Sequence, residues 1–297
     1  MVQEITPPPF LYRPSKSVAS PFVFAVPHSG RHYPMDFVKR SILDMKELRQ
    51  SEDAFVDKLF ADVPVCSAAL LIATHARAYL DLNRAENELD PDMFAPPLDT
   101  CSLDVSYRVQ AGLGVVPEYV AQDTPIYKER LPAREAEKRL VSVHRPYHQK
   151  LKSLLEKCRQ EFGVAFLIDC HSMPSEPPIN PKVSKPPTII LGDCWGSACM
   201  RDLTDITETL FLKAGFNVRR NVPYSGGYST SSYGAPNSGI HALQIEISRA
   251  LYMDEETLTP LPEFDAVKEA IGHISQELVA KIMERIHDHK PASQAAE

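Results

Sequence analysis

Short apolar runs alternate with amphipathic stretches along most of the 297-residue chain. Six runs predict strands, because they are rich in β-branched and aromatic residues and several are nearly continuous, as in strands covered on both faces. The runs span residues 22–26, 69–74, 79–82, 164–169, 188–191 and 241–247.

Three other stretches place apolar residues three or four positions apart, which predicts helices over 140–158, 196–214 and 262–287. Pro146 is expected to kink or begin the first of them. Strands that alternate with helices predict an α/β fold, a three-layer α/β/α sandwich around a mixed, mostly parallel sheet.

The chain shows no internal repeat and no clear linker, so we expect one domain over residues 1–297. Residues 1–19 are interpreted as a proline-rich N-terminal extension and residues 290–297 as a disordered tail. The long segment 87–132 has turn residues and little periodicity, which predicts a surface excursion over the sheet. Loops of this length in a compact domain are usually functional or mobile.

Charge and composition exclude several functions. The formal net charge is −7 and no Lys/Arg-rich run occurs, which argues against binding to nucleic acid or an anionic membrane. No apolar run approaches the roughly 20 residues of a membrane helix. The N-terminus has neither a basic leader nor an apolar segment, and the six cysteines include no CxxC pair, so we expect a cytoplasmic protein with reduced thiols.

Two histidines follow predicted strands. His28 comes after the run 22–26, and His171 comes after the run 164–169. Ligands of α/β proteins bind beyond the carboxyl ends of strands, so the two rings are candidates for one metal site, with Asp169 as an acceptor that orients His171. The alternative is a pair of ordinary hydrogen-bonded histidines.

Two further places carry polar residues of interest. In the segment 77–84, Asp81 and Asn83 share a face if the segment is a strand, and Arg84 can bind a carboxylate with two hydrogen bonds. Glu246 interrupts a strongly apolar run, where a buried carboxylate is costly unless it is paired or functional. A plain surface arginine and an ion pair between Glu246 and Arg249 are the respective alternatives.

A catalytic zinc site uses three protein ligands and leaves one position for water. The segment 52–60 offers Glu52, Asp53 and Asp57 on a predicted helix, although Ser51 or Asp53 can equally be a helix N-cap. No GxSxG elbow, phosphate loop or GxGxxG motif occurs, which removes support from the corresponding reaction classes.

Eight blocks in order make the chain resemble the N-formylglutamate amidohydrolases from about residue 20 to about residue 285. The blocks are HSGRHYP (28–34), EDAFVDKLF (52–60), RAYLDLNR (77–84), HRPYH (144–148), IDCHSMP (168–174), LGD (191–193), NVPYSGGY (221–228) and HALQIEISRALYMDE (241–255). The family is similar in fold to zinc carboxypeptidases, aspartoacylase and succinylglutamate desuccinylase, and the resemblance implies that fold here.

The resemblance implies one zinc ion bound by His28, His171 and an acidic residue. In the related enzymes the acidic ligand lies three residues after the first histidine, but Arg31 occupies that position here. We predict Asp53 as the third ligand, because the family's acidic block keeps it together with Asp57. Glu52 and Asp57 stay open as alternatives.

The resemblance also implies roles for other residues. Glu246 matches the general base, Arg77 the residue that polarises the scissile carbonyl, and Asn83 with Arg84 the carboxylate clamp. Tyr224 and Gly227 lie in a Tyr-Gly loop that is expected either to cover the substrate or to be a plain turn. His144 and His148 are four apart, and we expect a supporting role for them rather than metal binding.

Together these features predict zinc-dependent hydrolysis of N-formyl-L-glutamate to formate and L-glutamate, a step associated with histidine breakdown. The expected partner is a small acidic N-acyl amino acid, and the oligomeric state is left open. One alternative keeps the site but changes the substrate to another N-acyl or N-formyl amino acid or a small peptide, since one methylene is worth only about 1–3 kcal/mol in a pocket. The other is a metal-free protein that binds an acidic metabolite.

Overall fold

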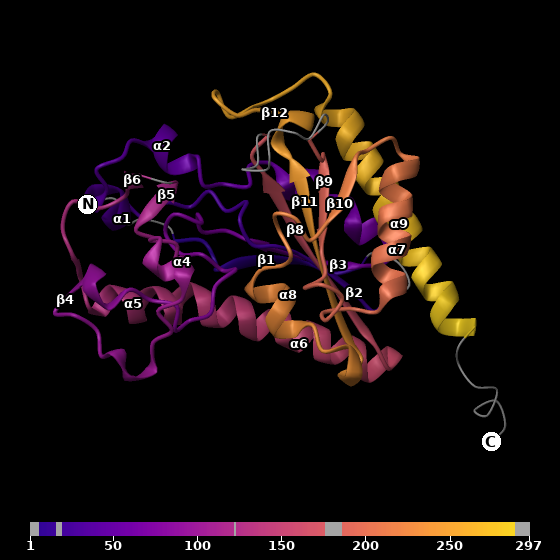
Figure 1. The fold of residues 1–297 in the computed structure, drawn as a ribbon, viewed down its shortest axis with the longest axis horizontal. Coiled ribbons are helices and arrows are strands. Elements are labelled where there is room, and N and C mark those ends of the chain that lie inside the picture. Colours follow the sequence, from indigo (N-terminus) through magenta and orange to yellow (C-terminus); the bar gives the residue numbers. More distant parts are fainter. Residues whose placement is uncertain (1–5, 16–19, 122, 176–185, 289–297) are drawn as a thin grey trace.

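A computed structural model describes residues 6–15, 20–121, 123–175 and 186–288 (Figure 1). The predicted C-terminal tail 290–297 lies outside the described residues. The described chain forms a seven-stranded sheet in the order β1-β3-β2-β8-β11-β9-β10. Its strands are β1 Phe10–Arg13, β2 Phe22–Val26, β3 Ala69–Ala73, β8 Ala165–Met173, β9 Ile189–Gly192, β10 Val218–Arg220 and β11 Ile240–Ser248.

The middle of the sheet is parallel. Strands β3, β2, β8 and β11 run in the same direction, whereas β1 is antiparallel to β3, and β9 is antiparallel to β11 and parallel to β10. The predicted mixed, mostly parallel sheet is therefore confirmed. Because the four central strands are parallel, their carboxyl ends meet at one edge, where α/β proteins bind their ligands.

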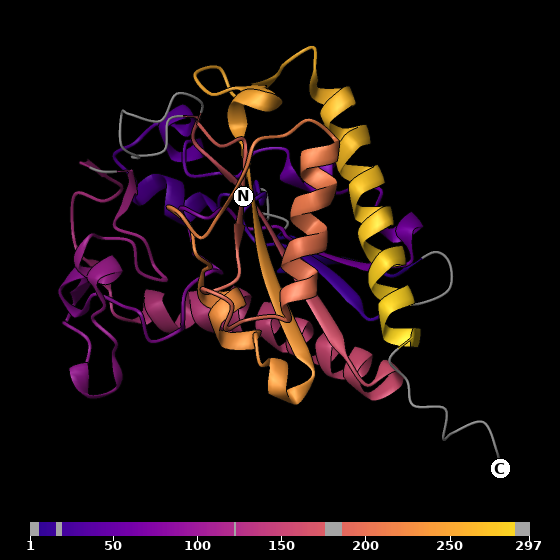
Figure 2. The same ribbon diagram turned by 45° about the vertical axis from the view of Figure 1, so that its right-hand side comes forward.

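Helices cover both faces of the sheet, which confirms the three layers (Figures 1 and 2). One core contains apolar side chains of α3 Val56–Leu59, α7 Arg201–Lys213 and α9 Phe264–Asp288. The other contains those of α1 Met35–Arg40, α2 Met45–Arg49, α5 Arg134–Arg139 and α6 Arg145–Phe162. The remaining helices are α4 Tyr107–Gln110 and α8 Tyr228–Tyr233.

Strand alternation sorts apolar from polar side chains. In β8, Phe166 and Ile168 belong to the core on the α7/α9 side, and Leu167 belongs to the core on the α6 side. Since successive side chains point to opposite faces, Asp169 and His171 share the face of Leu167. Gln244 and Glu246 lie opposite Asp169 and His171 on the neighbouring strand β11, so one face of the sheet carries four polar side chains in register.

The predicted strand over 79–82 is wrong. The amides of Tyr79 and Leu80 both donate to the carbonyl of Ala76, which closes a helix-like turn, and the amide of Asn83 donates to the side chain of Asp81. These local hydrogen bonds compete with strand pairing. The prediction over 164–169 is too short, because β8 continues through His171 to Met173.

The helix predicted over 140–158 is a longer run in three parts. Helix α5 is followed by a π-helical turn, Leu140–His144, and then by α6, with Pro146 in the first turn of α6. Proline has no backbone N–H, so the hydrogen-bond register of the preceding helix cannot continue through it. Helix α6 ends at Phe162 and is capped by Gly163, whose φ of 80° is in the left-handed region that favours glycine.

The helix predicted from residue 196 begins only at Arg201. Cys194 and Trp195 have φ values of 52° and 58°, and the Asp193 carboxylate accepts from the amide of Gly196, so a turn occupies this stretch. The last helix, predicted over 262–287, is found as α9. Strand β1 lies inside the segment 1–19, so part of that predicted extension is an edge strand of the sheet.

The excursion 87–132 lies beside the sheet, on the left in Figures 1 and 2, rather than over it. Most of its buried apolar side chains belong to the core on the α6 side. The excursion contains the short strands β4 Phe94–Ala95, β5 Tyr119–Ala121, β6 Thr124–Pro125 and β7 Leu131–Pro132. Two further short strands, β12 Met253–Asp254 and β13 Thr259–Pro260, come after β11 in the chain.

Candidate active site

Three buried side chains from separate parts of the chain meet at the carboxyl edge of the sheet. His28 follows β2, His171 lies in β8, and Asp53 lies in the turn before α3. The Nδ1 atoms of the two histidines are 3.2 Å apart, and Asp53 Oδ2 lies 3.3 Å from His28 Nδ1 and 3.1 Å from His171 Nδ1. We call these residues the donor triad.

The spacing of the triad suits a small divalent cation. Zinc takes nitrogen ligands at about 2.0–2.1 Å and carboxylate ligands at about 2.0–2.2 Å, and the edge of such a tetrahedron is about 3.3–3.6 Å. The three donor atoms therefore already form a triangle close to one face of a zinc coordination sphere, with the fourth position open.

Each donor side chain is held by a further contact on its other polar atom. His28 Nε2 lies 2.8 Å from Asp81 Oδ1, and His171 Nε2 lies 3.1 Å from Asp169 Oδ2. Arg249 Nη2 donates to Asp53 Oδ1 at 3.2 Å. A carboxylate on the far nitrogen fixes which nitrogen of each ring carries the proton and leaves Nδ1 able to bind a cation.

The electrostatics of the triad favour positive charge. Burial opposes ionisation of Asp53, but the hydrogen bonds from His171 and His28 hold the pKa of its carboxyl well below the usual range. Burial likewise opposes the charged form of His171, yet Asp169 and Asp53 raise the pKa of the ring well above its usual value. The surrounding carboxylates thus favour a cation at the position that a metal ion would fill.

The helix predicted for the segment 52–60 is found only over Val56–Leu59, so Asp53 precedes it, and backbone and side-chain hydrogen bonds hold Asp53 beside the histidines. The amide of Asp53 donates to the carbonyl of His28, and the Ser29 hydroxyl donates to the carbonyl of Asp53. The N-cap of α3 is Phe55, without a side-chain hydrogen bond, so Asp53 does not cap this helix.

The other two candidates for the acidic ligand face elsewhere. Glu52 accepts hydrogen bonds from Tyr33 and Arg49, and Asp57 pairs with Arg31, whose Nη2 lies 2.6 Å from Asp57 Oδ1. Arg31, which the resemblance put at the position expected for an acidic ligand, thus binds one of the other acidic side chains, and the carboxylate of the triad is that of Asp53.

Glu246 lies next to the triad on β11, opposite His171 in register. Its Oε1 accepts a hydrogen bond from Gln244 Nε2 at 2.8 Å. Burial raises the pKa of Glu246 to about 7, against the opposing effect of His171. The proposed ion pair with Arg249 is wrong, because the Arg249 guanidinium binds Asp53 and the carbonyls of Gln50 and Glu52.

Arg77 and Arg84 lie on either side of Asp81. Arg77 Nε donates to Asp81 Oδ2 at 3.0 Å, and its side chain is 29% exposed, so the guanidinium reaches accessible space. Arg84 is buried: its Nε donates to the carbonyl of Leu113, its Nη1 donates to the carbonyl of Asn83, and its Nη2 lies 3.9 Å from Asp81 Oδ2.

Asn83 connects the triad to the Tyr-Gly loop, residues 224–228. Its Nδ2 lies 3.2 Å from His171 Nε2, and its Oδ1 accepts from the amide of Ser229. A Cβ at Gly227 would lie 2.6 Å from Asn83 Cγ, so only glycine allows this close approach. Burial and the charge of Glu246 raise the pKa of Tyr224.

His144 and His148 contact the backbone of the same segment. His144 Nε2 lies 2.9 Å from the carbonyl of Arg84, and His148 Nε2 lies 3.0 Å from the carbonyl of Leu82. Neither belongs to the group of side chains in the described residues that could hold a metal ion together. This geometry fits the expected supporting role.

Comparisons with known proteins show which family the chain belongs to. The family model for N-formylglutamate amidohydrolase matches residues 20–253. The chain belongs to this family. The resemblance read from the eight sequence blocks is therefore confirmed, and so is the prediction of an enzyme of the hydrolase class.

Individual relatives match nearly the whole chain. N-formylglutamate deformylase of Pseudomonas putida is 29% identical over 79% of this chain and 82% of its own length, and that of Pseudomonas aeruginosa is 26% identical over 89% and 92%. A solved structure of N-formylglutamate amidohydrolase from Ralstonia eutropha has a TM-score of 0.87 at 31% identity and covers 93% of this chain and 99% of its own.

The amidohydrolase site also contains three residues whose contacts there were not predicted from the sequence. Asp81 orients His28, Arg249 holds Asp53, and Gln244 links Glu246 to the amide of Gly227. Asp81 carried a signal, since it lies in the same block as Asn83 and Arg84. Gln244, two residues before Glu246, is on the same strand face, which also marks it as a candidate.

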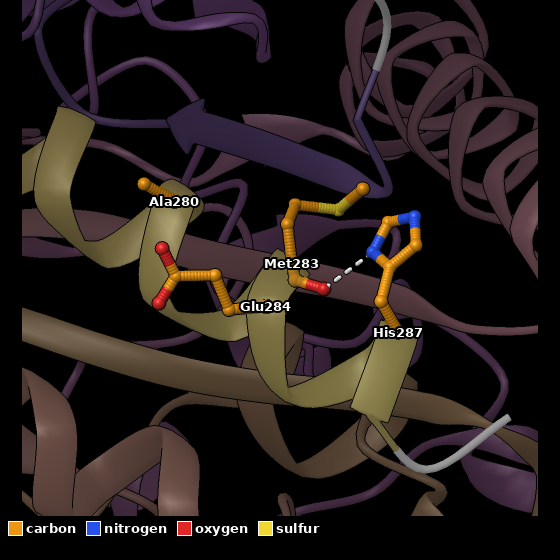
Figure 3. A pocket seen from close by; sticks show the side chains of 4 residues that line it. All are labelled: Ala280, Met283, Glu284 and His287. Atoms are coloured by element: carbon orange, nitrogen blue, oxygen red, sulfur yellow. Dashed lines mark hydrogen bonds between the residues drawn. The ribbon is translucent and has the colours of Figure 1, made fainter.

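A hollow elsewhere on the molecule has no such chemistry. Figure 3 shows its lining, Ala280, Met283, Glu284 and His287, which all project from the C-terminal end of α9. His287 Nδ1 is hydrogen bonded to the carbonyl of Met283 within the same helix. Among the described residues no helix is long and apolar enough to cross a membrane, and the cytoplasmic location stays a prediction.

Proposed function

We propose that this family member hydrolyses N-formyl-L-glutamate to formate and L-glutamate, with one zinc ion held by His28, Asp53 and His171. The observation that carries the proposal is the donor triad, whose atoms are 3.1–3.3 Å apart, directly beside Glu246. Membership of the amidohydrolase family supports the substrate.

The residues present fit a zinc ion. Two imidazoles and one carboxylate form a usual catalytic zinc set, and the carboxylates behind both rings keep the imidazoles in the orientation that binding requires. When bound, zinc supplies Lewis-acid polarisation and makes hydroxide available near neutral pH.

Glu246 is the proposed general base. Its carboxylate accepts a proton from the attacking water, and the oxygen of that water forms the new bond to the formyl carbon. The same carboxyl then gives the proton to the amide nitrogen as the C–N bond breaks, so that formate and the amine of glutamate leave. A pKa near 7 suits a group that must both accept and donate this proton at neutral pH.

Arg77 is the proposed donor to the carbonyl oxygen, where negative charge develops. Burial disfavours its charged form, but Asp81, Asp53 and Glu246 raise the pKa of the guanidinium overall, so it stays a cation. A donor aimed at the developing oxyanion typically contributes about 10²–10³ in rate.

Arg84 and Asn83 are the proposed binding residues for the substrate carboxylate that lies next to the scissile amide. Arg84 uses two of its five N–H groups on backbone carbonyls, which fixes the guanidinium and leaves others for a ligand. Asn83 holds the Tyr-Gly loop close by through the amide of Ser229. We propose that Tyr224 and Gly227, both in this loop, line one side of the substrate-binding site.

Formate release from a panel of N-formyl and N-acyl amino acids tests the proposal. We expect turnover of N-formyl-L-glutamate that is highest in the panel, lost with a chelator and restored by zinc. Faster turnover of another N-acyl substrate or a small peptide would keep the site and replace the substrate. Binding of acidic metabolites without any hydrolysis or stoichiometric metal would replace the enzyme by a binding protein.

A further inference from the structure

Gln244 has no role in the proposed mechanism, although it contacts the proposed general base. It lies on β11, two residues before Glu246, so both side chains project from the same face of the strand. Both are buried, with exposed fractions of 4% for Gln244 and 7% for Glu246. Gln244 Nε2 donates to Glu246 Oε1 at 2.8 Å, and within the described part of the chain it is the only donor of a hydrogen bond to this carboxylate.

This single hydrogen bond determines how the Glu246 carboxylate is presented. The last torsion angle of a glutamate side chain has a broad, roughly two-fold energy profile, so packing alone leaves the plane of the carboxylate poorly defined. The bond to Oε1 fixes the plane and leaves Oε2 to accept a proton. A general base must lie within hydrogen-bond reach of the proton that it accepts, so the proposed reaction depends on this orientation.

The orientation of the Gln244 amide is determined in turn by the Tyr-Gly loop. The backbone amide of Gly227 donates to Gln244 Oε1 at 2.6 Å. A backbone N–H can only donate, so the side-chain oxygen of Gln244 must face Gly227 and its NH2 group must face Glu246. A reversed side-chain amide would set donor against donor at the loop and oxygen against oxygen at the carboxylate. Each of the two hydrogen bonds therefore enforces the other.

Close backbone contacts hold the loop on the sheet beside Gln244. Gly192 of β9 is the antiparallel register partner of Gln244. A Cβ at Gly192 would lie 2.8 Å from Gly226 N, so the loop lies directly on the strand at this point. On its other side the loop packs through Gly227 against the Asn83 carboxamide. The Gly227 N–H consequently has a fixed position from which it orients Gln244.

We infer that Gln244 is a positioning residue, which holds Glu246 with Oε2 free to accept the proton, in the orientation that the Gly227 amide imposes. This inference rests on the proposed function, in which Glu246 is the general base. A merely structural residue that only fastened the loop to the sheet would contribute the same factor to the rate whether or not Glu246 is present.

A double-mutant cycle with Glu246→Gln tests the inference. Gln244→Met keeps the length of the side chain but removes the donor. With Glu246 present, we expect kcat for N-formyl-L-glutamate to fall roughly 10- to 100-fold, as for a reacting group misplaced by about 1 Å. With Glu246→Gln, the same substitution should cost little further activity, because the base that Gln244 orients is already gone. Glu246→Asp, whose shorter side chain withdraws the carboxylate from Gln244, gives a second background with higher residual turnover and the same expectation.

Bound metal should stay at the wild-type level in Gln244→Met, because the two hydrogen bonds of Gln244 go to Gly227 and Glu246 and not to the donor triad. Gln160→Met is the matched control, since it removes an exposed glutamine of α6 whose Nε2 donates to Glu156 at 2.9 Å. It should leave kcat at the wild-type value.

The outcomes separate the inference from the proposed function. Equal fold-losses in all backgrounds, an unchanged kcat in Gln244→Met or a loss of metal from this variant would overturn the role of Gln244 alone. A wild-type chain that releases no formate from N-formyl-L-glutamate, or a Glu246→Gln variant with near-normal turnover, would instead refute the proposed function.

Discussion

At the scale of residues, the site depends on side chains that hold other side chains. The far nitrogen of each triad histidine faces a carboxylate, Asp81 for His28 and Asp169 for His171, and the far oxygen of Asp53 accepts from Arg249. These contacts remove rotational freedom before any ligand arrives, so less entropy is lost on binding.

Asp81→Asn tests this view of the triad. The amide cannot carry the negative charge that favours a cation, and it orients His28 less well, so metal affinity should fall about 10- to 100-fold. Competition with a chromophoric chelator measures the change. Asp62→Asn, in an exposed pair with Lys268, is the control. Unaltered affinity in Asp81→Asn would show that the ring needs no such partner.

Glu246→Gln separates chemistry from metal binding. The variant keeps the shape of the side chain but cannot accept a proton, so kcat should fall about 10²- to 10⁴-fold while bound metal and melting temperature stay at wild-type values. Formate release and metal analysis of the same preparation give both readouts. The control is Glu263→Gln, which makes the same substitution at an exposed residue just before α9. Near-normal turnover of Glu246→Gln would remove Glu246 from the mechanism.

At the scale of elements, the site lies where loops close over the ends of parallel strands. The amide of Gly227 donates to Gln244 Oε1 on β11, and the loop after it is fixed by Asn83. One small residue therefore lets a loop, a strand and the 77–84 turn approach one another closely.

Gly227→Ala should disturb this junction, because the added Cβ would meet the Asn83 carboxamide. We expect lower kcat/KM and a lower melting temperature. Gly272→Ala, in α9 with nothing near its Cβ, should instead stabilise the chain by about 0.5–1 kcal/mol. Thermal melts and formate release of both variants check the pair. A Gly227→Ala enzyme that behaves like wild type would mean that the loop adapts freely.

Helix α6 contributes a pH dependence through His148. Burial and the neighbouring His144 lower the pKa of His148 to about 3, whereas the unfolded chain protonates a histidine near pH 6.5. The unfolded state therefore binds the extra proton first, and the free energy of unfolding should fall as the pH decreases from about 6.5 toward 3. One proton contributes at most about 1.4 kcal/mol per pH unit.

His148→Gln should make this loss of stability shallower, because the amide does not titrate. Denaturant unfolding at several pH values between 4 and 7 measures the slope. His273→Gln removes an exposed histidine of α9 and should leave the slope as it is. Equal slopes for wild type and His148→Gln would contradict a neutral buried ring.

At the scale of the whole molecule, the donor triad joins three segments that the chain order separates: the end of β2, the turn before α3, and β8. A ligand that binds all three at once binds the folded state and has no equivalent site in the unfolded chain. Its binding free energy is then added to the stability of the fold.

Metal removal should therefore affect stability as well as turnover. A chelator is expected to abolish formate release and lower the melting temperature, and zinc should restore both; at 100 times the dissociation constant the added stability is about 2.7 kcal/mol. The same treatment of His171→Ala should leave its melting temperature unchanged. Full activity of metal-free protein would contradict the proposed zinc site.

Much of the fold could be predicted because periodicity reports burial directly. The predicted bounds of β2, β9 and α9 lie within two residues of the observed ones, because each element is apolar on the faces that pack. The segment 79–82 has a similar composition, but side-chain and turn hydrogen bonds decide its conformation, and these depend on Asp81 and on residues such as Val115 that are distant in sequence.

The sequence by itself indicated the α/β architecture, the family and the two histidines of the donor triad, because apolar periodicity, ordered motif blocks and strand-end histidines are local features. Only the tertiary structure decided which acidic side chain faces the histidines. Glu52 binds Tyr33, Asp57 binds Arg31, and Asp53 lies beside His171. It also decided the positions of Asp81 and Arg249, whose contacts come from segments that meet only when the sheet and its loops are assembled.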